Sequence, residues 1–384
     1  MKHNLENKKL TIYLEGEFNS YNAEEVAKEI DEIISKNEFD ELVIDLEKLS
    51  YVSSAGLRVF LKLKQRFNNF SIINASLEVY DVFQMTGFNN MMTIKKALRS
   101  VDVSKAEVIG EGYFSTVYRL DKDTIVKVFN RTSDEGQVER ELRLAKEAFV
   151  LGVPTAISFD IVKAGDKLGV MFEMLDCESL KSILINDKAH YEENLKKYAE
   201  LLKKINSTEC DNKEIPSIKK RYLEKVDFIK PYLEDKYYKK ARALIESIPD
   251  RKTFVHGDCH FKNIMVQKGE FLLIDMDTLS VGHPIFELAA IYAPYCAFNE
   301  DEPGNSLKFF GINDEYASKL YNDLLNLYFG KDDEVIKEKI RLLAYVHMVW
   351  WNRVNEPENN KRLEGCRSRL YSLLDKYDDL NIGI

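Results

Sequence analysis

The segment HGDCHFKN, residues 256–263, gathers two histidines, an aspartate and an asparagine within eight positions. Asp258 and Asn263 are five positions apart, the interval at which a phosphoryl-transfer loop places its base and an amide that binds Mg²⁺. Asp275 follows an apolar, strand-like run, where a second metal-binding side chain is expected. These residue types predict that Asp258 orients and deprotonates an acceptor hydroxyl, while Asn263 and Asp275 hold Mg²⁺.

Zinc binding is an alternative chemistry for this segment, because His256 and His260 have the i, i+4 spacing of helical zinc ligands. Gly257 disfavours a helix between them, the glutamate of the helical zinc motif is missing, and the sequence suggests no third ligand. We therefore interpret both histidines as residues that shape the loop.

The segment GEGYFSTVY, residues 110–118, lies between two strand patterns, as a glycine-rich flap over phosphates does. Backbone N–H groups at Gly110 and Gly112 can approach phosphates closely. A dinucleotide fold would need a following helix and a third glycine at Ser115, and a P-loop would need a Gly-Lys-Ser/Thr ending. On this motif alone, a structural hairpin explains the segment equally well.

Lys127 interrupts the apolar strand TIVKVF, residues 124–129. An unpaired buried charge is costly, so a buried Lys127 requires an anionic partner, whereas an exposed strand lysine requires none. Glu141 in the following helix can pair with Lys127 and hold its ammonium toward nucleotide phosphates. Glu139 and Glu147 compete for that role, and all three glutamates are also compatible with a solvated helix face.

These motifs lie in a long second part of the chain. A strand pattern begins at Val108, strands with one helix (about 136–152) continue to residue 175, and helical periodicity dominates from about residue 176. We predict an α+β bilobal domain over residues 101–384, with a small lobe at about 104–175, a helical large lobe at about 176–384, and a cleft between the lobes.

The second part resembles the aminoglycoside phosphotransferase and choline-kinase-like branch of the protein-kinase fold over roughly residues 104–350. The resemblance rests on an ordered series of segments: GEGYFSTVY, IVKV, VERE, HGDCHFKN, LLIDMD and GHPIFELA. It implies ATP or GTP as phosphate donor and Mg²⁺ as cofactor. It also implies three sets of site residues: Asp258 as base; Asn263 and Asp275 as metal ligands; and Gly110, Gly112, Ser115, Lys127, Glu141 and the hinge Glu173 to Leu175 as nucleotide-binding residues.

Two positions depart from the family pattern: Ser115 replaces a flap glycine, and Glu287 stands where relatives usually carry aspartate. Protein kinases continue from the metal-binding aspartate into a long activation segment. Here Met-Asp follows Asp275, and Pro284 arrives nine residues after Asp275, which leaves little room for a peptide-docking platform. We therefore expect the acceptor to be a hydroxyl of a small molecule that is aminoglycoside-, amino alcohol- or sugar-like.

Residues 1–100 predict a separate α/β domain. Strand patterns at 10–18, 41–46 and 70–75 alternate with helical patterns at about 23–35, 55–67 and 77–85. The stretch LVIDLEKLSYVSSAGLRVFL, residues 42–61, resembles the core of a STAS domain, the fold of anti-sigma-factor antagonists. The resemblance implies a regulatory domain that binds a protein partner.

The same resemblance implies a phosphorylated serine at the start of a helix, and the matching position is Ser54. A phosphate there would add about −1.5 to −2 charge at a helix N-terminus and alter partner binding. Ser53 stands where an aspartate usually precedes that serine. The alternative interpretation is that Ser53 or Ser54 caps the helix by accepting a backbone N–H bond.

Composition excludes several classes of protein. The 384 residues are 45% hydrophobic and 31% charged with a net charge of −9, and no basic stripe favours nucleic-acid binding. The longest apolar run is shorter than the ~20 residues of a membrane span. The five cysteines show no paired spacing and the N-terminus has no apolar export signal, so we expect a cytoplasmic protein.

The leading hypothesis is an ATP- and Mg²⁺-dependent phosphotransferase acting on a small-molecule hydroxyl, preceded by a STAS domain. The alternative hypothesis is a signalling protein. Its kinase-like domain would phosphorylate the STAS domain or a partner protein, or would serve as a nucleotide-binding interaction module.

Overall fold

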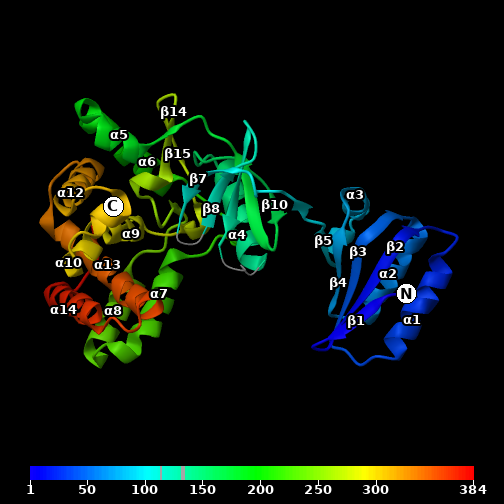
Figure 1. Ribbon diagram of the computed structural model, residues 1–384. Coiled ribbons are helices and arrows are strands. Elements are labelled where there is room, and N and C mark those ends of the chain that lie inside the picture. The colour runs from blue at the N-terminus through cyan, green and yellow to red at the C-terminus, as the bar shows by residue number, and fades with distance from the viewer. Residues whose placement is uncertain (113–114, 131–134) are drawn as a thin grey trace. The chain divides into compact units, whose positions relative to one another are not determined.

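Two separate units make up the chain in the computed structural model, which describes residues 1–112, 115–130 and 135–384 (Figure 1). The first unit is Met1–Val101 and the second is Asp102–Ile384. Each unit has its own cluster of buried apolar side chains. A two-residue strand, β6 (Arg99–Ser100), lies at the end of the first unit.

A five-stranded sheet forms the centre of the first unit, in the order β1-β2-β3-β4-β5. The hairpin of β1 and β2 is antiparallel, and the remaining neighbours are parallel. The central strand has five successive buried residues, Leu42 to Leu46, as expected for a strand covered on both faces. The strands are β1 (His3–Glu6), β2 (Lys9–Phe18), β3 (Glu41–Val52), β4 (Phe70–Ala75) and β5 (Thr93–Lys96).

Helices α1 (Ala23–Ser35), α2 (Ser54–Arg66) and α3 (Leu77–Met85) and the short helix η1 (Phe88–Asn90) connect these strands. Ser53 is the N-cap of α2, because its hydroxyl accepts a hydrogen bond from the backbone N–H of Gly56 at 3.3 Å. A Cβ at Gly56 would lie 2.9 Å from the Phe18 ring, so only glycine lets α2 approach β2 this closely.

An antiparallel sheet with one long helix begins the second unit. Its strand order is β10-β11-β9-β8-β7. Helix α4 (Glu135–Val150) packs against β10 and β11 and buries Val138, Leu144 and Ala148. The strands are β7 (Glu107–Glu111), β8 (Ser115–Arg119), β9 (Thr124–Phe129), β10 (Ser158–Ala164) and β11 (Lys167–Glu173).

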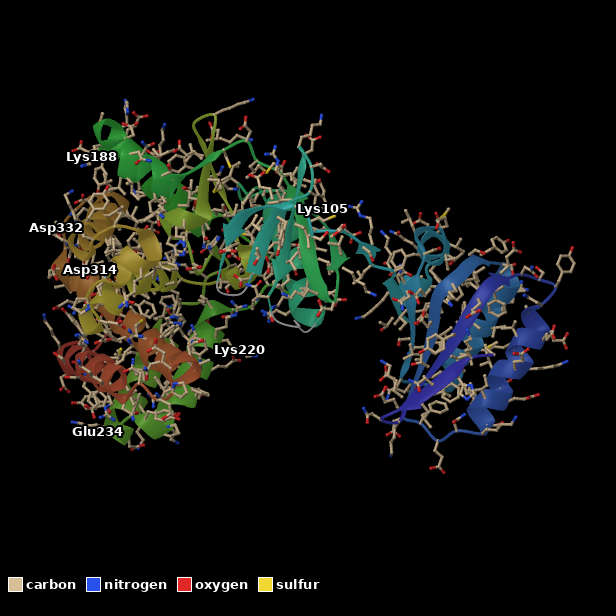
Figure 2. The ribbon with its side chains drawn as sticks, in the orientation of Figure 1. Lys105, Lys188, Lys220, Glu234, Asp314 and Asp332 are labelled. Atoms are coloured by element: carbon tan, nitrogen blue, oxygen red, sulfur yellow. The ribbon has the colours of Figure 1, made fainter. Side chains whose placement is uncertain are left out.

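The rest of the second unit is mainly helical. Its helices are α5 (Leu180–Asn186), α6 (Tyr191–Ser207), α7 (Ile218–Ile229), α8 (Asp235–Ser247), α9 (Ile285–Tyr292), α10 (Phe298–Asp301), α11 (Asn305–Phe310), α12 (Asp314–Phe329), α13 (Glu334–Asn355) and α14 (Asn360–Lys376). Charged side chains such as Lys188, Glu234 and Asp332 are exposed on this unit (Figure 2).

Short strands and turns join these helices. The strands are β12 (Glu178–Ser179), β13 (Phe254–Val255), β14 (Ile264–Gln267), β15 (Glu270–Leu273) and β16 (Ser280–Val281). The short helices are η2 (Lys188–His190), η3 (Lys230–Tyr232), η4 (Phe261–Asn263), η5 (Met276–Thr278) and the π-helical turn η6 (Ala293–Ala297). Strands β12, β14 and β15 form one small sheet, and β13 pairs with β16.

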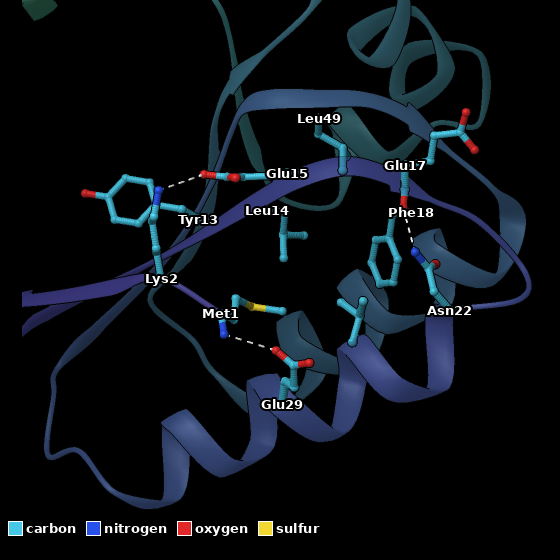
Figure 3. A pocket seen from close by; sticks show the side chains of 11 residues that line it. Met1, Lys2, Tyr13, Leu14, Glu15, Glu17, Phe18, Asn22, Glu29 and Leu49 are labelled. Carbon is cyan, nitrogen blue, oxygen red and sulfur yellow. Dashed lines mark hydrogen bonds and ion pairs between the residues drawn. The ribbon is translucent and has the colours of Figure 1, made fainter.

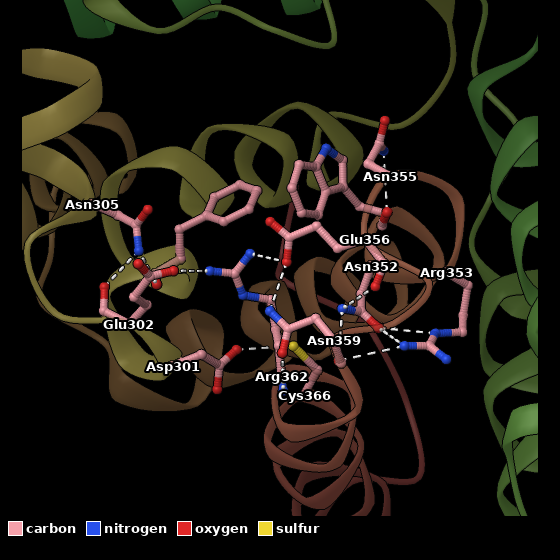
Figure 4. Close-up of polar contacts among 12 residues, drawn as sticks. Asp301, Glu302, Asn305, Asn352, Arg353, Asn355, Glu356, Asn359, Arg362 and Cys366 are labelled. Carbon is pink, nitrogen blue, oxygen red and sulfur yellow. Dashed lines mark hydrogen bonds and ion pairs between the residues drawn. The ribbon is translucent and has the colours of Figure 1, made fainter.

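A buried polar network holds α14 against α10 and the end of α13 (Figure 4). Arg362 of α14 is 4% exposed, and its guanidinium lies 2.6 Å from Glu302 and 2.5 Å from Glu356. One turn further along α14, the Cys366 thiol donates to Asp301 at 3.0 Å. Because the arginine has carboxylates on both sides, its charge is neutralised inside the protein.

Candidate functional site

The loop that carries Asp258 follows β13, and Glu287 of α9 binds its backbone. The Glu287 carboxylate is fully buried and accepts hydrogen bonds from the backbone N–H groups of His256 at 2.5 Å and Gly257 at 3.1 Å. Burial raises the pKa of Glu287 to about 7. The glutamate that departs from the family pattern therefore still ties the loop backbone to the helical core.

Gly257 has a φ of 83°, and a Cβ there would lie 3.2 Å from Thr278. Thr278 donates its hydroxyl proton to the carbonyl oxygen of His256 at 2.6 Å. The glycine thus allows both the left-handed turn and the close packing of η5 on the loop.

Both ring nitrogens of His256 are used within the protein. Its Nε2 lies 3.1 Å from the carbonyl oxygen of Ile274, and its Nδ1 accepts from the backbone N–H of Asp258 at 3.3 Å. Burial lowers the pKa of His256, which keeps the ring neutral. Among the described residues, no group of three His, Cys, Asp or Glu side chains is arranged to hold a metal ion. The geometry therefore gives no support to zinc binding by His256 and His260.

Asp258 and Asn263 face each other across the loop. The Asn263 amide nitrogen donates to the carbonyl oxygen of Asp258 at 2.9 Å and to its carboxylate at 3.0 Å. The side chain of Asp258 remains 43% exposed, so its carboxylate is accessible to a small molecule. Because the amide nitrogen of Asn263 faces Asp258, its amide oxygen is directed away from Asp258.

Lys127 joins the sheet both to α4 and to Asp275, which lies between β15 and η5. Its Nζ lies 2.8 Å from Glu141 and 2.7 Å from Asp275, and the lysine side chain is only 13% exposed. Of the three glutamates that the sequence offered as partners, Glu141 makes the contact because α4 packs on η5. Burial alone would lower the pKa of Lys127, but Asp275 and then Glu141 raise it above its usual range.

Carboxylates outnumber cations around Lys127. Asp275, with φ 68° and ψ 68°, sits in the left-handed region between β15 and η5. Burial and the negative charge of Asp275 raise the pKa of Asp277 to about 8. Burial would also raise the pKa of Asp275, but Lys127 keeps it below its usual value. Carboxylate and amide oxygens are the ligands that Mg²⁺ prefers, so Asp275 and Asn263 fit this ion.

The flap residues lie beside this cluster in the sheet. Gly110 is in β7, Ser115 begins β8, and the N–H of Gly112 donates to the carbonyl oxygen of Ser115 at 2.8 Å. Tyr113 and Phe114 of the predicted flap lie outside the described residues.

The predicted hinge follows directly from the end of β11. The Glu173 carboxylate accepts from the backbone N–H of Ile157 at 2.7 Å, so its side chain braces the hinge. Met174 is anchored by a backbone bond of 2.8 Å from its N–H to Asp123.

Sequence reasoning missed two lysines near Asp258. Lys262 lies within the loop, and burial and the positive charge of Lys181 lower its pKa. Nothing in the local pattern singles out Lys181, which is 81 residues before Lys262 in the chain. The position of Lys262 between Asp258 and Asn263 was the one signal that could have drawn attention to it.

In the first unit, Ser54 is exposed at the start of α2, whereas Ser53 is 7% exposed and caps the helix. A separate open pocket of about 510 Å³ lies between β2 and α1, lined in part by Leu14, Phe18 and Val26 (Figure 3). The amino group of Met1 pairs with Glu29 at its rim, 3.1 Å away.

The second unit has the architecture of a bilobal kinase: an antiparallel sheet with one long helix, a helical lobe, a Lys127–Glu141 ion pair, and an Asp258–Asn263 loop. The chain belongs to the phosphotransferase enzyme family, whose model matches residues 105–315. Residues 2–101 match the STAS domain. The predicted fold class, a STAS-like α/β domain followed by an α+β kinase-like domain, is therefore confirmed.

Similar proteins differ between the two units. The anti-sigma-B factor antagonist of Listeria monocytogenes is 33% identical over 90 residues, which cover 22% of this chain and 78% of that protein. A choline/ethanolamine kinase family protein from Mesorhizobium loti is 12% identical over 71% of this chain and 88% of its own, with a TM-score of 0.47. The ADP-bound aminoglycoside phosphotransferase APH(2'')-Ib is 17% identical over 72% and 94%, with a TM-score of 0.48.

No helix in the described part of the chain is both long and apolar enough to cross a membrane.

Proposed function

We propose that residues 101–384 transfer the γ-phosphoryl group of ATP or GTP to a hydroxyl of a small molecule, in a reaction that requires Mg²⁺. The observation that carries this proposal is the position of Lys127, 2.8 Å from Glu141 and 2.7 Å from Asp275. This pairing supports a lysine that is oriented toward nucleotide phosphates. Membership of the phosphotransferase enzyme family supports the reaction class.

In this proposal each residue has a separate role. Asp258 orients the acceptor hydroxyl and accepts its proton, and Glu287 positions the loop backbone that carries Asp258. Lys127 contacts the α- and β-phosphates, with Gly110, Gly112 and Ser115 covering them. Asn263 and Asp275 hold Mg²⁺, which when bound screens the charge of the phosphates. Backbone groups of Glu173 and Leu175 meet the adenine or guanine ring.

The test is phosphate transfer from γ-labelled ATP and GTP to aminoglycosides, amino alcohols, sugars and their acidic derivatives, using the full chain. We expect label in a small molecule, dependent on Mg²⁺ and lost in Asp258→Asn. Nucleotide binding without transfer to any hydroxyl compound or protein would instead favour a nucleotide-binding interaction module.

We also propose that residues 1–100 form a regulatory domain that binds a protein partner. The similarity to an anti-sigma-B factor antagonist supports this role. One observation favours a second function for the kinase domain, phosphorylation of Ser54, because Ser54 is exposed while Ser53 does the capping. We expect Ser54 to remain unlabelled in the same experiment. Rapid labelling of Ser54 that is independent of protein concentration and absent in Asp258→Asn would establish a self-modifying switch.

A further inference from the structure

Lys181 and Lys262 converge on the end of α11, beside the loop that carries Asp258. The Lys262 ammonium lies 4.3 Å from the centre of the Phe309 ring and donates to the Phe309 carbonyl oxygen at 3.4 Å. The Lys181 ammonium lies 3.7 Å from the point where a Cβ on Gly311 would be. Phe309 and Gly311 are two residues apart, so the two positive charges approach the same short segment from α5 and from the loop.

Among the residues that the structure describes, no Asp or Glu forms an ion pair with Lys181 or Lys262, although both side chains are half-buried. Asp258 is near enough to Lys262 to act on its charge but makes no direct contact with it. Two other mostly buried lysines in this unit are neutralised: Lys219 lies 3.3 Å from Asp250, and Lys339 lies 2.5 Å from Asp379. Two like charges held near each other repel, and an anion placed between them would relieve that repulsion.

The neighbourhood of the pair matches an acceptor site. Asp258 is close enough for its negative charge to act on Lys262, and its carboxylate is 43% exposed. The His260 ring lies edge-on to Phe309, its Nε2 is 3.6 Å from Asp258, and its buried Nδ1 has no partner among the described residues. The Phe309 ring itself is 46% exposed. The two lysine ammonium groups, the Phe309 ring and the His260 imidazole therefore lie around one accessible side of the loop that carries Asp258.

We propose that Lys181 and Lys262 together bind an oxyanion, carboxylate or phosphate, carried by the hydroxyl compound that this protein phosphorylates. This inference rests on the proposed function and narrows it to acidic acceptors. The carbon skeleton of the acceptor lies against Phe309, and its hydroxyl reaches Asp258. A positively charged aminoglycoside or amino alcohol would meet the repulsion of two lysines at the same place, so such compounds are poor acceptors.

The transfer step is balanced with groups already named. The acceptor oxygen forms a bond to the γ-phosphorus, the bond between that phosphorus and the β,γ-bridging oxygen breaks, and the nucleoside diphosphate leaves with the electron pair. The hydroxyl proton passes to the Asp258 carboxylate. The lysines take no part in bond making, so they act by binding and positioning the acceptor.

A matched series of three-carbon alcohols tests this inference with the full chain, Mg²⁺ and ATP. Glycerate, glycerol 3-phosphate, glycerol and 3-amino-1,2-propanediol differ chiefly in the charge of one end group. We expect a higher kcat/KM for at least one of the two acidic alcohols than for glycerol, and the lowest for the amine. The glycerate and glycerol 3-phosphate arms distinguish a carboxylate from a phosphate as the bound oxyanion.

Two variants locate the effect. Lys262→Gln and Lys181→Gln should each reduce kcat/KM for the preferred acidic alcohol about tenfold or more, with glycerol nearly unchanged, because each removes one charged hydrogen bond. Lys262→Glu should shift the preference toward the amine. Lys188→Gln, an exposed lysine near the end of α5 (Figure 2), is the matched control and should have no effect.

The affinity of each variant for ATP, measured by calorimetry, distinguishes a failure of the acidic-acceptor inference from a failure of the proposed phosphotransferase function. Equal or better phosphorylation of the amine, or no preference among the four alcohols, would overturn the acidic acceptor. A loss of ATP affinity equal to the loss of kcat/KM would also overturn it, since the lysines would then contact the nucleotide. Failure of the wild-type protein to bind ATP at all would overturn the proposed function itself.

Discussion

The second unit contains two buried groups of charged residues that differ in their balance of charge. In the first group, Lys127 is the cation that contacts Glu141 and Asp275. Asp277 is close enough for the charges of these residues to shift its pKa. Around Arg362, a similarly buried cation lies between two carboxylates, and further cations neutralise the neighbouring acidic residues. Those additional pairs are Arg369 with Asp301, Arg341 with Glu300 and Lys308 with Glu302.

This difference in charge balance distinguishes a ligand-binding site from a structural brace, a group of ion pairs that only holds helices together. An excess of carboxylate oxygens is costly in the folded protein alone and is offset when a cation is added, which suits a Mg²⁺-nucleotide site. A balanced network needs no ligand and holds helices together. Changes in the first group should therefore affect activity more than stability, and changes in the second group should do the reverse.

Asp258→Asn gives the largest expected effect. It removes the proton acceptor but keeps the shape of the loop and its hydrogen bond to Asn263, so kcat should fall roughly 10²–10⁴-fold. Nucleotide affinity and the unfolding midpoint should stay near those of the wild type. The measurements are steady-state kinetics and calorimetry with the preferred acceptor. Unchanged turnover would remove Asp258 from the proposed role.

Arg362→Met tests the structural brace. It removes the cation that Glu302 and Glu356 share and leaves Glu302 its surface contact with Lys308. We expect the free energy of unfolding to fall by roughly 2–3 kcal/mol, less than for a fully buried pair because Glu302 is 49% exposed. Urea unfolding followed by tryptophan fluorescence is specific for this unit, since the chain's two tryptophans are both in α13.

Lys308→Met is the control for this variant, because Lys308 also pairs with Glu302 but is 69% exposed. This substitution should lower the free energy of unfolding by less than about 1 kcal/mol. Equal effects of the two substitutions would contradict the distinction between a buried and a surface contact.

Asp275→Ala tests the unbalanced group. Affinity for ATP in Mg²⁺ should fall at least about tenfold, because a metal ligand is lost, while affinity in EDTA changes little. The unfolding midpoint without nucleotide should change little, because the loss of the ion pair with Lys127 opposes the relief of repulsion between Asp275 and Asp277. Calorimetry and urea unfolding provide the two measurements. A destabilised variant that still binds Mg²⁺-ATP would reverse the comparison.

Substitution of Lys225 has the smallest expected effect. Lys225 is a partly buried cation whose charge makes the stability of this unit depend on pH. Its ammonium lies 2.8 Å from Nδ1 of His347 on α13 and near Arg221 on α7, and no carboxylate among the described residues pairs with it. Burial, followed by the charge of Arg221, lowers the pKa of Lys225 to about 7. Between that value and the unfolded value of 10.5, the unfolded chain binds more protons than the folded one.

Stability should therefore rise with pH over this window in the wild type. Lys225→Met should lack that rise and should be more stable near pH 7 by on the order of 1 kcal/mol. Lys220→Met, an exposed position on the same helix, should keep the pH dependence of the wild type. Parallel pH profiles for the wild type and Lys225→Met would show that Lys225 is not responsible.

Much of the architecture could be predicted because it is written in local patterns. Alternating apolar residues marked the strand at residues 10–18, and the polar stretch near residue 101 marked the end of the first unit. The family resemblance rested on short segments whose order along the chain is their strongest feature, and the family models match residues 2–101 and 105–315. The roles assigned to Asp258, Asn263 and Asp275 remain predictions for the experiments above.

Other features could not be predicted from local patterns. The residue pattern alone left Glu139 and Glu147 as competitors of Glu141 for Lys127. The family resemblance implied Glu141, and the packing of α4 brings Glu141 into contact. The sequence also offered two serines as the cap of α2, and Ser53 is the one whose hydroxyl accepts the hydrogen bond. In each case the candidates have the same chemistry, and only the rotation of a helix against its neighbours separates them.

By itself, the sequence determined the order of the two units, the five-residue spacing of Asp258 and Asn263, and the glycines that allow tight turns, because these depend on neighbours along the chain. Only the tertiary structure decided which distant charges meet. Lys127 reaches Asp275 across 148 positions, and Lys181 approaches Lys262 across 81. Such contacts arise when the packing of whole helices and sheets brings remote residues together, and no local periodicity encodes the resulting distances.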